Sequence, residues 1–218
     1  MPKLATTVAA LAALALATPA TAAVSLSVTS GTNPYSGPAP TYDFDSGRPA
    51  NVTGGSIVSG TAAPHAQPYG STGGYFSVGP DDGSPGTIDL TSFAVLNSIS
   101  FIWGSVDSYN TLQLLDGAGP GATVLYSFTG NDVFNPANGD QSNPSTNPLV
   151  TLLLTGGDQT AVRALRLSST QNAFEIDNVA INAVPEPSTW ALMLLGFGAV
   201  GFSMRRGRNA TPRLSALA

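Results

Sequence analysis

The chain has no cysteine and a single histidine among its 218 residues. Without cysteine, neither a disulfide framework nor a thiol nucleophile is available, and one histidine excludes a multi-histidine metal cluster. No serine stands in a Gly-x-Ser-x-Gly turn, so the hydrolase elbow is missing as well. His65 is flanked by Pro64 and Pro68, and we expect it to be an ordinary loop residue. These absences favour a protein that is not an enzyme.

Basic residues are scarce in the middle of the chain. The segment 23–184 holds twelve acidic residues but only three arginines, which gives a formal charge of −9. Such a surface repels nucleic acid and anionic lipid, so we expect neither as a partner.

The N-terminus has one charge, Lys3, followed by an apolar stretch over residues 8–17. About ten apolar residues are too few to span a membrane, but they fit the core of a secretory signal peptide. Ala20 and Ala22 supply the small residues of a cleavage site. We therefore predict a signal peptide over 1–22, the general secretion machinery and signal peptidase as partners, and an exported protein.

The C-terminus contains an uncharged apolar run over residues 190–204. As a helix it would reach roughly 22 Å, less than the roughly 30 Å hydrocarbon core of a bilayer. With two flanking residues and some thinning of the bilayer, we predict a short transmembrane helix over 188–204 that anchors the chain transiently in the inner membrane. A buried core helix is the alternative, but three glycines make the run a poor soluble helix.

A basic cluster ends this run, and prolines precede it. The positive-inside rule places the arginines and the tail 209–218 in the cytoplasm. Two prolines discourage helix on the other side and leave an accessible segment there. The basic residues are Arg205, Arg206 and Arg208, and the proline-framed residues are Pro185, Glu186 and Pro187.

The segment 184–208 resembles the PEP-CTERM sorting signal, which is also catalogued as an ice-binding protein C-terminal domain. The resemblance implies recognition by exosortase in a Gram-negative bacterium that makes exopolysaccharide. It implies that Pro185, Glu186 and Pro187 form the recognition motif. It further implies removal of the apolar tail, followed by release or attachment at the cell surface or extracellular matrix. No flat, Thr-rich repeat supports transfer of the ice-binding label to the rest of the chain.

Between the two signals, the segment 23–183 has the pattern of a single all-β domain. From residue 87 onward, apolar runs of strand length alternate with turn signals, and no long amphipathic helix is indicated. Before that, only three short strands are expected, as edge strands between long loops. Together these predict a β-sandwich, jelly-roll-like in type. The predicted strands cover residues 42–45, 56–58, 75–78, 99–103, 109–115, 124–128, 149–154, 165–167 and 174–181.

The last of these strands changes its alternation. Phe174 and Ile176 share one parity, whereas Val179 and Ile181 share the other. A strand of period two cannot shift in this way without an extra residue, so we predict a β-bulge or tight corner at residues 177–178.

Two segments of this domain also resemble a group of exosortase-dependent surface proteins of unknown activity. The first runs from Ser98 to Leu115 around Trp103-Gly104-Ser105-Val106-Asp107, and the second is Phe174 to Val179. This resemblance carries no catalytic residue over to the chain.

Two pairs of carboxylates are the candidate binding residues. Asp43 with Asp45, and Asp81 with Asp82, stand in Gly-containing turns of the kind that bind Ca²⁺, although ordinary turn chemistry explains the same residues. No other cofactor is indicated. Exposed aromatics would offer a platform for sugars, and the candidates are Tyr35, Tyr69, Tyr75 and Trp103, of which Trp103 has the spacing of a core residue.

The sequence thus favours a non-catalytic surface or matrix protein that binds exopolysaccharide. A secreted glycoside hydrolase, with two carboxylates brought together from distant strands, is the alternative.

Overall fold

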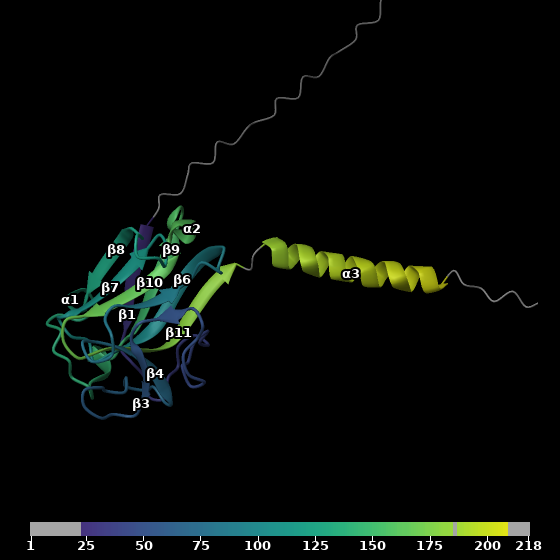
Figure 1. Cartoon of the computed structure of the whole chain (residues 1–218). Coiled ribbons are helices and arrows are strands. Elements are labelled where there is room, and N and C mark those ends of the chain that lie inside the picture. The colour runs from purple at the N-terminus through teal and green to yellow at the C-terminus, as the bar shows by residue number, and fades with distance from the viewer. Residues whose placement is uncertain (1–22, 185–186, 209–218) are drawn as a thin grey trace, which may run out of the picture.

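Two antiparallel β-sheets form the body of the protein (Figure 1). The computed structural model describes residues 23–184 and 187–208. The strands are β1 (Ala23–Thr29), β2 (Val52–Thr53), β3 (Ser56–Ser59), β4 (Gly74–Val78), β5 (Gly86–Asp89), β6 (Val95–Gly104), β7 (Asn110–Leu115), β8 (Val124–Thr129), β9 (Leu149–Thr155), β10 (Ala164–Ser169) and β11 (Phe174–Val184). The helices are α1 (Gly130–Val133), α2 (Asp158–Ala161) and α3 (Pro187–Arg208), with a 3₁₀ turn over Pro144–Thr146.

The strand order is that of a jelly roll. The larger sheet has the order β1-β9-β6-β11-β4-β3, and the smaller has β2-β5-β10-β7-β8. From β4 to β11, every connection except the β7–β8 hairpin passes from one sheet to the other, which winds eight strands into two Greek keys. The all-β prediction is therefore confirmed.

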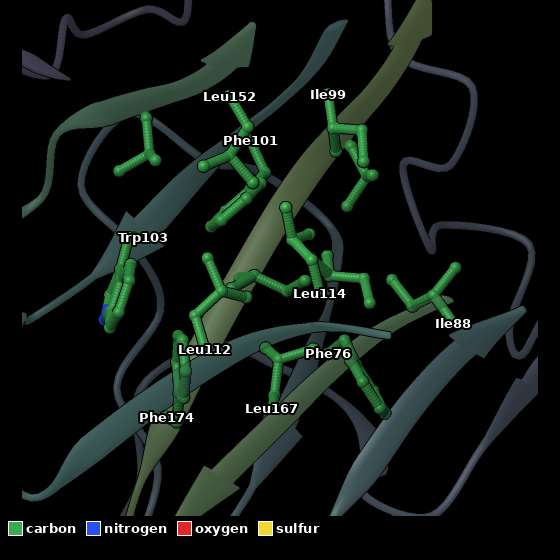
Figure 2. Close-up of a cluster of buried hydrophobic side chains, with 14 of the residues drawn as sticks. Phe76, Ile88, Ile99, Phe101, Trp103, Leu112, Leu114, Leu152, Leu167 and Phe174 are labelled. Atoms are coloured by element: carbon green, nitrogen blue, oxygen red, sulfur yellow. The ribbon is translucent and has the colours of Figure 1, made fainter. Parts of the chain in front are cut away.

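The core lies between the two sheets and is rich in aromatic side chains (Figure 2). Strand β6 contributes Phe101 and Trp103, and β7 contributes Leu112 and Leu114, all fully buried. Trp103 stacks on Phe174 of β11 with ring centroids 4.3 Å apart. Because each strand turns alternate residues inward, these side chains interdigitate from both sheets. The interpretation of Trp103 as a core residue is confirmed.

Strand β11 contains the predicted irregularity. Its pairing with β6 is in register up to Asp177 and resumes at Ala180, so the ladder shifts between them. Asn178 lies in the left-handed region with φ of 52°. Asparagine tolerates this conformation better than most residues, which lets the strand accommodate the extra residue. The prediction of a bulge at residues 177–178 is confirmed.

The first third of the chain differs from its predicted form. The expected strand over 42–45 is absent from the described residues, where Tyr42 makes only an isolated bridge to Val179. The expected edge strand at 75–78 is β4, which lies inside the sheet between β11 and β3. The edge strand β1 was not predicted, because its small and apolar residues follow the signal peptide without a turn signal between them.

Helix α3 begins at Pro187 and projects away from the sheets (Figure 1). Proline suits a first helical position because its missing N–H would have no partner there. Side chains from residue 191 to 205 are all exposed. Among the described residues, no helix is both long and apolar enough to cross a membrane. The predicted transmembrane helix over 188–204 is therefore not supported, since Gly196, Gly198 and Gly201 dilute a short apolar run.

Candidate functional site

The first predicted carboxylate pair holds a loop against the end of β4. Asp45 accepts a hydrogen bond from the backbone N–H of Gly74 at 2.7 Å, and Asp43 accepts one from the N–H of Asp45 at 3.2 Å. Both aspartates are exposed. The bond to Asp43 closes a local turn, and the bond to Asp45 attaches the loop to β4.

The second pair is engaged in the same way. Asp82 accepts a hydrogen bond from the Ser77 hydroxyl at 2.6 Å and lies 3.1 Å from Nδ1 of His65. Asp81 accepts a hydrogen bond from the side-chain amide of Asn172. In the part of the chain that the structure describes, no three acidic or histidine side chains are arranged to hold a metal ion. The calcium interpretation thus gains no support.

The contact of His65 with Ser77 and Asp82 does not make a catalytic triad. Ser77 Oγ and Asp82 Oδ2 both lie beside the same imidazole nitrogen, at 3.3 Å and 3.1 Å. A relay needs one partner at each nitrogen. Ser77 is also fully buried, so a substrate would not reach it. His65 lies in a loop as predicted, and its contact attaches that loop to β4.

Two buried carboxyls on β11 were missed by the sequence analysis. Glu175 and Asp177 alternate with the core residues Phe174 and Ile176, so they point to the outer face of the larger sheet. On a sheet with an open outer face, this pattern would place both in solvent. Instead each is about 1% exposed.

The segment 61–73 covers these carboxyls. Glu175 accepts hydrogen bonds from the N–H of Ala66 at 3.0 Å and from the hydroxyl of Ser105 at 3.3 Å. Asp177 accepts one from the hydroxyl of Ser71 at 2.6 Å. Pro68 lies so close to Gly104 that a Cβ there would come within 2.7 Å of its ring, which leaves room only for glycine.

Burial strongly changes the acidity of both groups. It raises the pKa of Glu175 from its ordinary value to about 7, against the opposing hydrogen bonds from Ala66 and Ser105. It raises the pKa of Asp177 to about 7 as well, and the negative charges of Asp45 and Asp43 add to the effect. Both carboxyls therefore keep their protons to a higher pH than an exposed carboxyl does.

Two of the four candidate aromatics are unavailable to a ligand. Tyr75 and Trp103 are fully buried, whereas Tyr35 and Tyr69 are partly exposed. Tyr35 lines a hollow on the larger sheet together with the apolar residues Ile102 and Leu149. The remaining lining is small and uncharged, and consists of Thr29, Ser30, Gly31, Thr32, Ser36 and Gly37.

The decisive similarity lies in the C-terminal segment. Residues 183–208 match the family model described as the PEP-CTERM protein-sorting motif. The chain carries a PEP-CTERM sorting signal. No curated protein and no solved structure matches the chain.

The PEP-CTERM signal indicates export, sorting to the cell surface and processing by exosortase. Its Pro187, Arg205, Arg206 and Arg208 lie in α3, and Arg205 is exposed. Pro185 and Glu186 lie outside the described residues, as do the predicted cleavage site at Ala20 and Ala22 and the tail 209–218. The resemblance of segments 98–115 and 174–179 to other exosortase-dependent proteins stays a prediction.

Proposed function

We propose that this protein is a non-catalytic surface protein whose jelly roll binds exopolysaccharide. Export and cell-surface sorting follow from the PEP-CTERM motif. Beyond export and sorting, we propose that the protein is not an enzyme and that its ligand is exopolysaccharide.

One observation supports the non-catalytic role: the candidate carboxyl groups are hydrogen-bonded within the fold or buried. A glycosidase needs two carboxyl groups facing each other across an open cleft, about 5 to 10 Å apart. Asp45 clamps the N–H of Gly74, and Asp82 is bound by Ser77 and His65. Glu175 and Asp177 lie beneath the segment 61–73. The engagement of these groups in contacts within the fold supports the non-catalytic role.

The hollow beside Tyr35 supports binding of a neutral sugar. A partly exposed aromatic ring beside several hydroxyl groups offers both a stacking surface and hydrogen bonds to a saccharide. No charged side chain lines the hollow. The acidic surface of the domain would further disfavour a polyanionic ligand.

The test is a binding assay with purified mature protein and exopolysaccharide from the same cells. We expect the wild type to bind, and Tyr35→Ala to bind at least several-fold more weakly. Tyr69→Ala is the matched control, because Tyr69 is also partly exposed but does not line the hollow. Equal binding by the Tyr35→Ala variant, after its fold is checked by thermal melting, would contradict the proposed site.

One observation favours the alternative of a secreted glycoside hydrolase. Glu175 and Asp177 lie on one face of β11, both with a pKa of about 7, and such perturbed carboxyls are common in active sites. The segment 61–73 would then have to open. Turnover of the exopolysaccharide that Glu175→Gln abolishes would establish the hydrolase, and turnover abolished by Asp43→Asn or Asp81→Asn would overturn the non-catalytic role equally.

The processing step has its own test. Intact-mass measurement of the mature protein from cells with and without exosortase should show loss of the C-terminal segment only when exosortase is present. A wild-type mass that retains residues 190–218 would contradict processing at the motif.

A further inference from the structure

The outer edge of β1 is open. Strand β1 ends the larger sheet, and within residues 23–184 and 187–208 no strand pairs with its other side. Its inner edge pairs with β9 over seven consecutive residues without a register shift. Backbone groups of an antiparallel strand point alternately to either side, so about half of the N–H and C=O groups of β1 face away from β9. These groups form a template for another strand.

The other edges of the two sheets are protected in ways that β1 is not. Strands β2 and β3 are only two and four residues long. The ladder that holds β8 is interrupted by a register shift between Leu114 and Leu115. Strand β1 has seven residues with neither a charge nor a proline. Short strands, bulges, charges and prolines are the usual protection against edge pairing, and β1 has none of them.

The core-facing side chains of β1 are incompletely covered. Val24 and Leu26 pack against the core but stay partly exposed, and Val28 is 40% exposed. Another strand added at this edge would bring its own side chains beside them and remove apolar surface from water.

The sequence of β1 indicates that the added strand is β1 of a second copy. It is Ala-Val-Ser-Leu-Ser-Val-Thr, and from Val24 to Val28 it is the same in both directions. Two antiparallel copies related by a two-fold axis at Leu26 would place Leu26 opposite itself. Each valine would then face a valine and each serine a serine. Self-complementarity of this kind is what a two-fold interface requires.

We propose that two copies of this chain join through their β1 strands into one continuous sheet across a two-fold axis. The shared edge is roughly 24 Å long at 3.4 Å per residue. None of the acidic residues lies in β1, so the edge itself carries no like-charge repulsion. A single strand pair buries little surface, and we therefore expect a weak, concentration-dependent dimer.

The first experiment measures the mass of purified mature protein by sedimentation over a range of concentrations. The wild type should shift from monomer to dimer as concentration rises. Ser25 and Ser27 are exposed and would face each other across the axis, so S25K/S27K should stay monomeric with an unchanged melting temperature. S25E/S27E should stay monomeric too, and an equimolar mixture of the two variants should restore the dimer. Ser127→Lys on the exposed face of β8 is the control and should dimerise like the wild type.

A second experiment reports on the axis directly. Because the chain has no cysteine, Leu26→Cys forms a disulfide only where two copies meet at residue 26. Mild oxidation should yield a covalent dimer of this variant and none of Ser127→Cys. The proposal is overturned if the wild type is monomeric at every soluble concentration, if S25K/S27K dimerises unchanged, or if only Ser127→Cys is cross-linked.

Discussion

The buried carboxyl of Glu175 makes the stability of the domain depend on pH. In the folded protein its pKa is about 7, whereas the ordinary value is 4.5. Between these values the folded state holds a proton that the unfolded state has released, so stability falls as pH rises through this window. At 1.36 kcal/mol per pKa unit, the loss is about 3 kcal/mol, a large share of the 5–15 kcal/mol typical of a domain.

Glu175→Gln tests this directly, because glutamine resembles the protonated acid. Its carbonyl oxygen can accept from the N–H of Ala66, and its amide can donate to the hydroxyl of Ser105. We expect the variant to match the wild type near pH 5 and to melt roughly 10 °C higher near pH 8. Thermal melting followed by circular dichroism across this range is the measurement.

Neighbouring carboxylates act on the pKa of both Glu175 and Asp177. Asp107 lies near Glu175, and Asp43 and Asp45 act on Asp177, which contributes a second pH-dependent loss of the same sign. The control is Ser127→Ala, an exposed and non-titrating position on β8, which should leave the slope unchanged. The reasoning is refuted if the wild-type melting temperature is flat or rises between pH 5 and pH 8. It is equally refuted if the double variant of Glu175→Gln and Asp177→Asn keeps the full wild-type slope.

Three further substitutions test individual features of the fold, each by urea unfolding. Asn178→Val should cost about 1–2 kcal/mol because its φ is positive, whereas Asn178→Gly should stay close to the wild type; equal losses would argue against a left-handed residue. Trp103→Phe should cost less than the 3–5 kcal/mol expected of Trp103→Ala, since Nε1 of Trp103 has no hydrogen-bond partner among the described residues. Asp45→Ala should cost about 1 kcal/mol through loss of its bond to Gly74, and no loss would show that the loop is held by other contacts.

The sequence alone predicts those strands in which apolar and polar residues alternate regularly. Leu165 and Leu167 are buried and Arg166 is less so, as their spacing predicts. The change of parity along β11 located the bulge at Asp177 and Asn178, because the two faces of a strand cannot exchange without an inserted residue. The C-terminal sorting signal could also be predicted from the sequence, because it is defined by a short contiguous segment.

The burial of Glu175 and Asp177 could not be predicted from the alternation of residues along the strand. Their alternation with Phe174 and Ile176 is that of a strand with one solvent-exposed face. What buries them is the segment 61–73, more than a hundred residues earlier, and its Pro, Gly and Ser content indicates only a loop. The order of the strands was hidden for the same reason, because pairing depends on contacts between distant segments. The predicted transmembrane helix over 188–204 is not supported, because the uncharged run 190–204 is short and contains three glycines.

Strand β11 has a consequence for the timing of events at the membrane. It pairs with β4 only over Phe174–Ile176, but its pairing with β6 continues to Val184, where the sorting segment begins. In the sequence, Pro185 follows Val184 directly, so no linker separates the motif from the end of the strand. Exosortase must therefore either accommodate the end of a folded jelly roll beside its active site or act before β11 has taken its place. Inserting flexible residues after Val184 would distinguish these two orders, because only the first predicts faster processing.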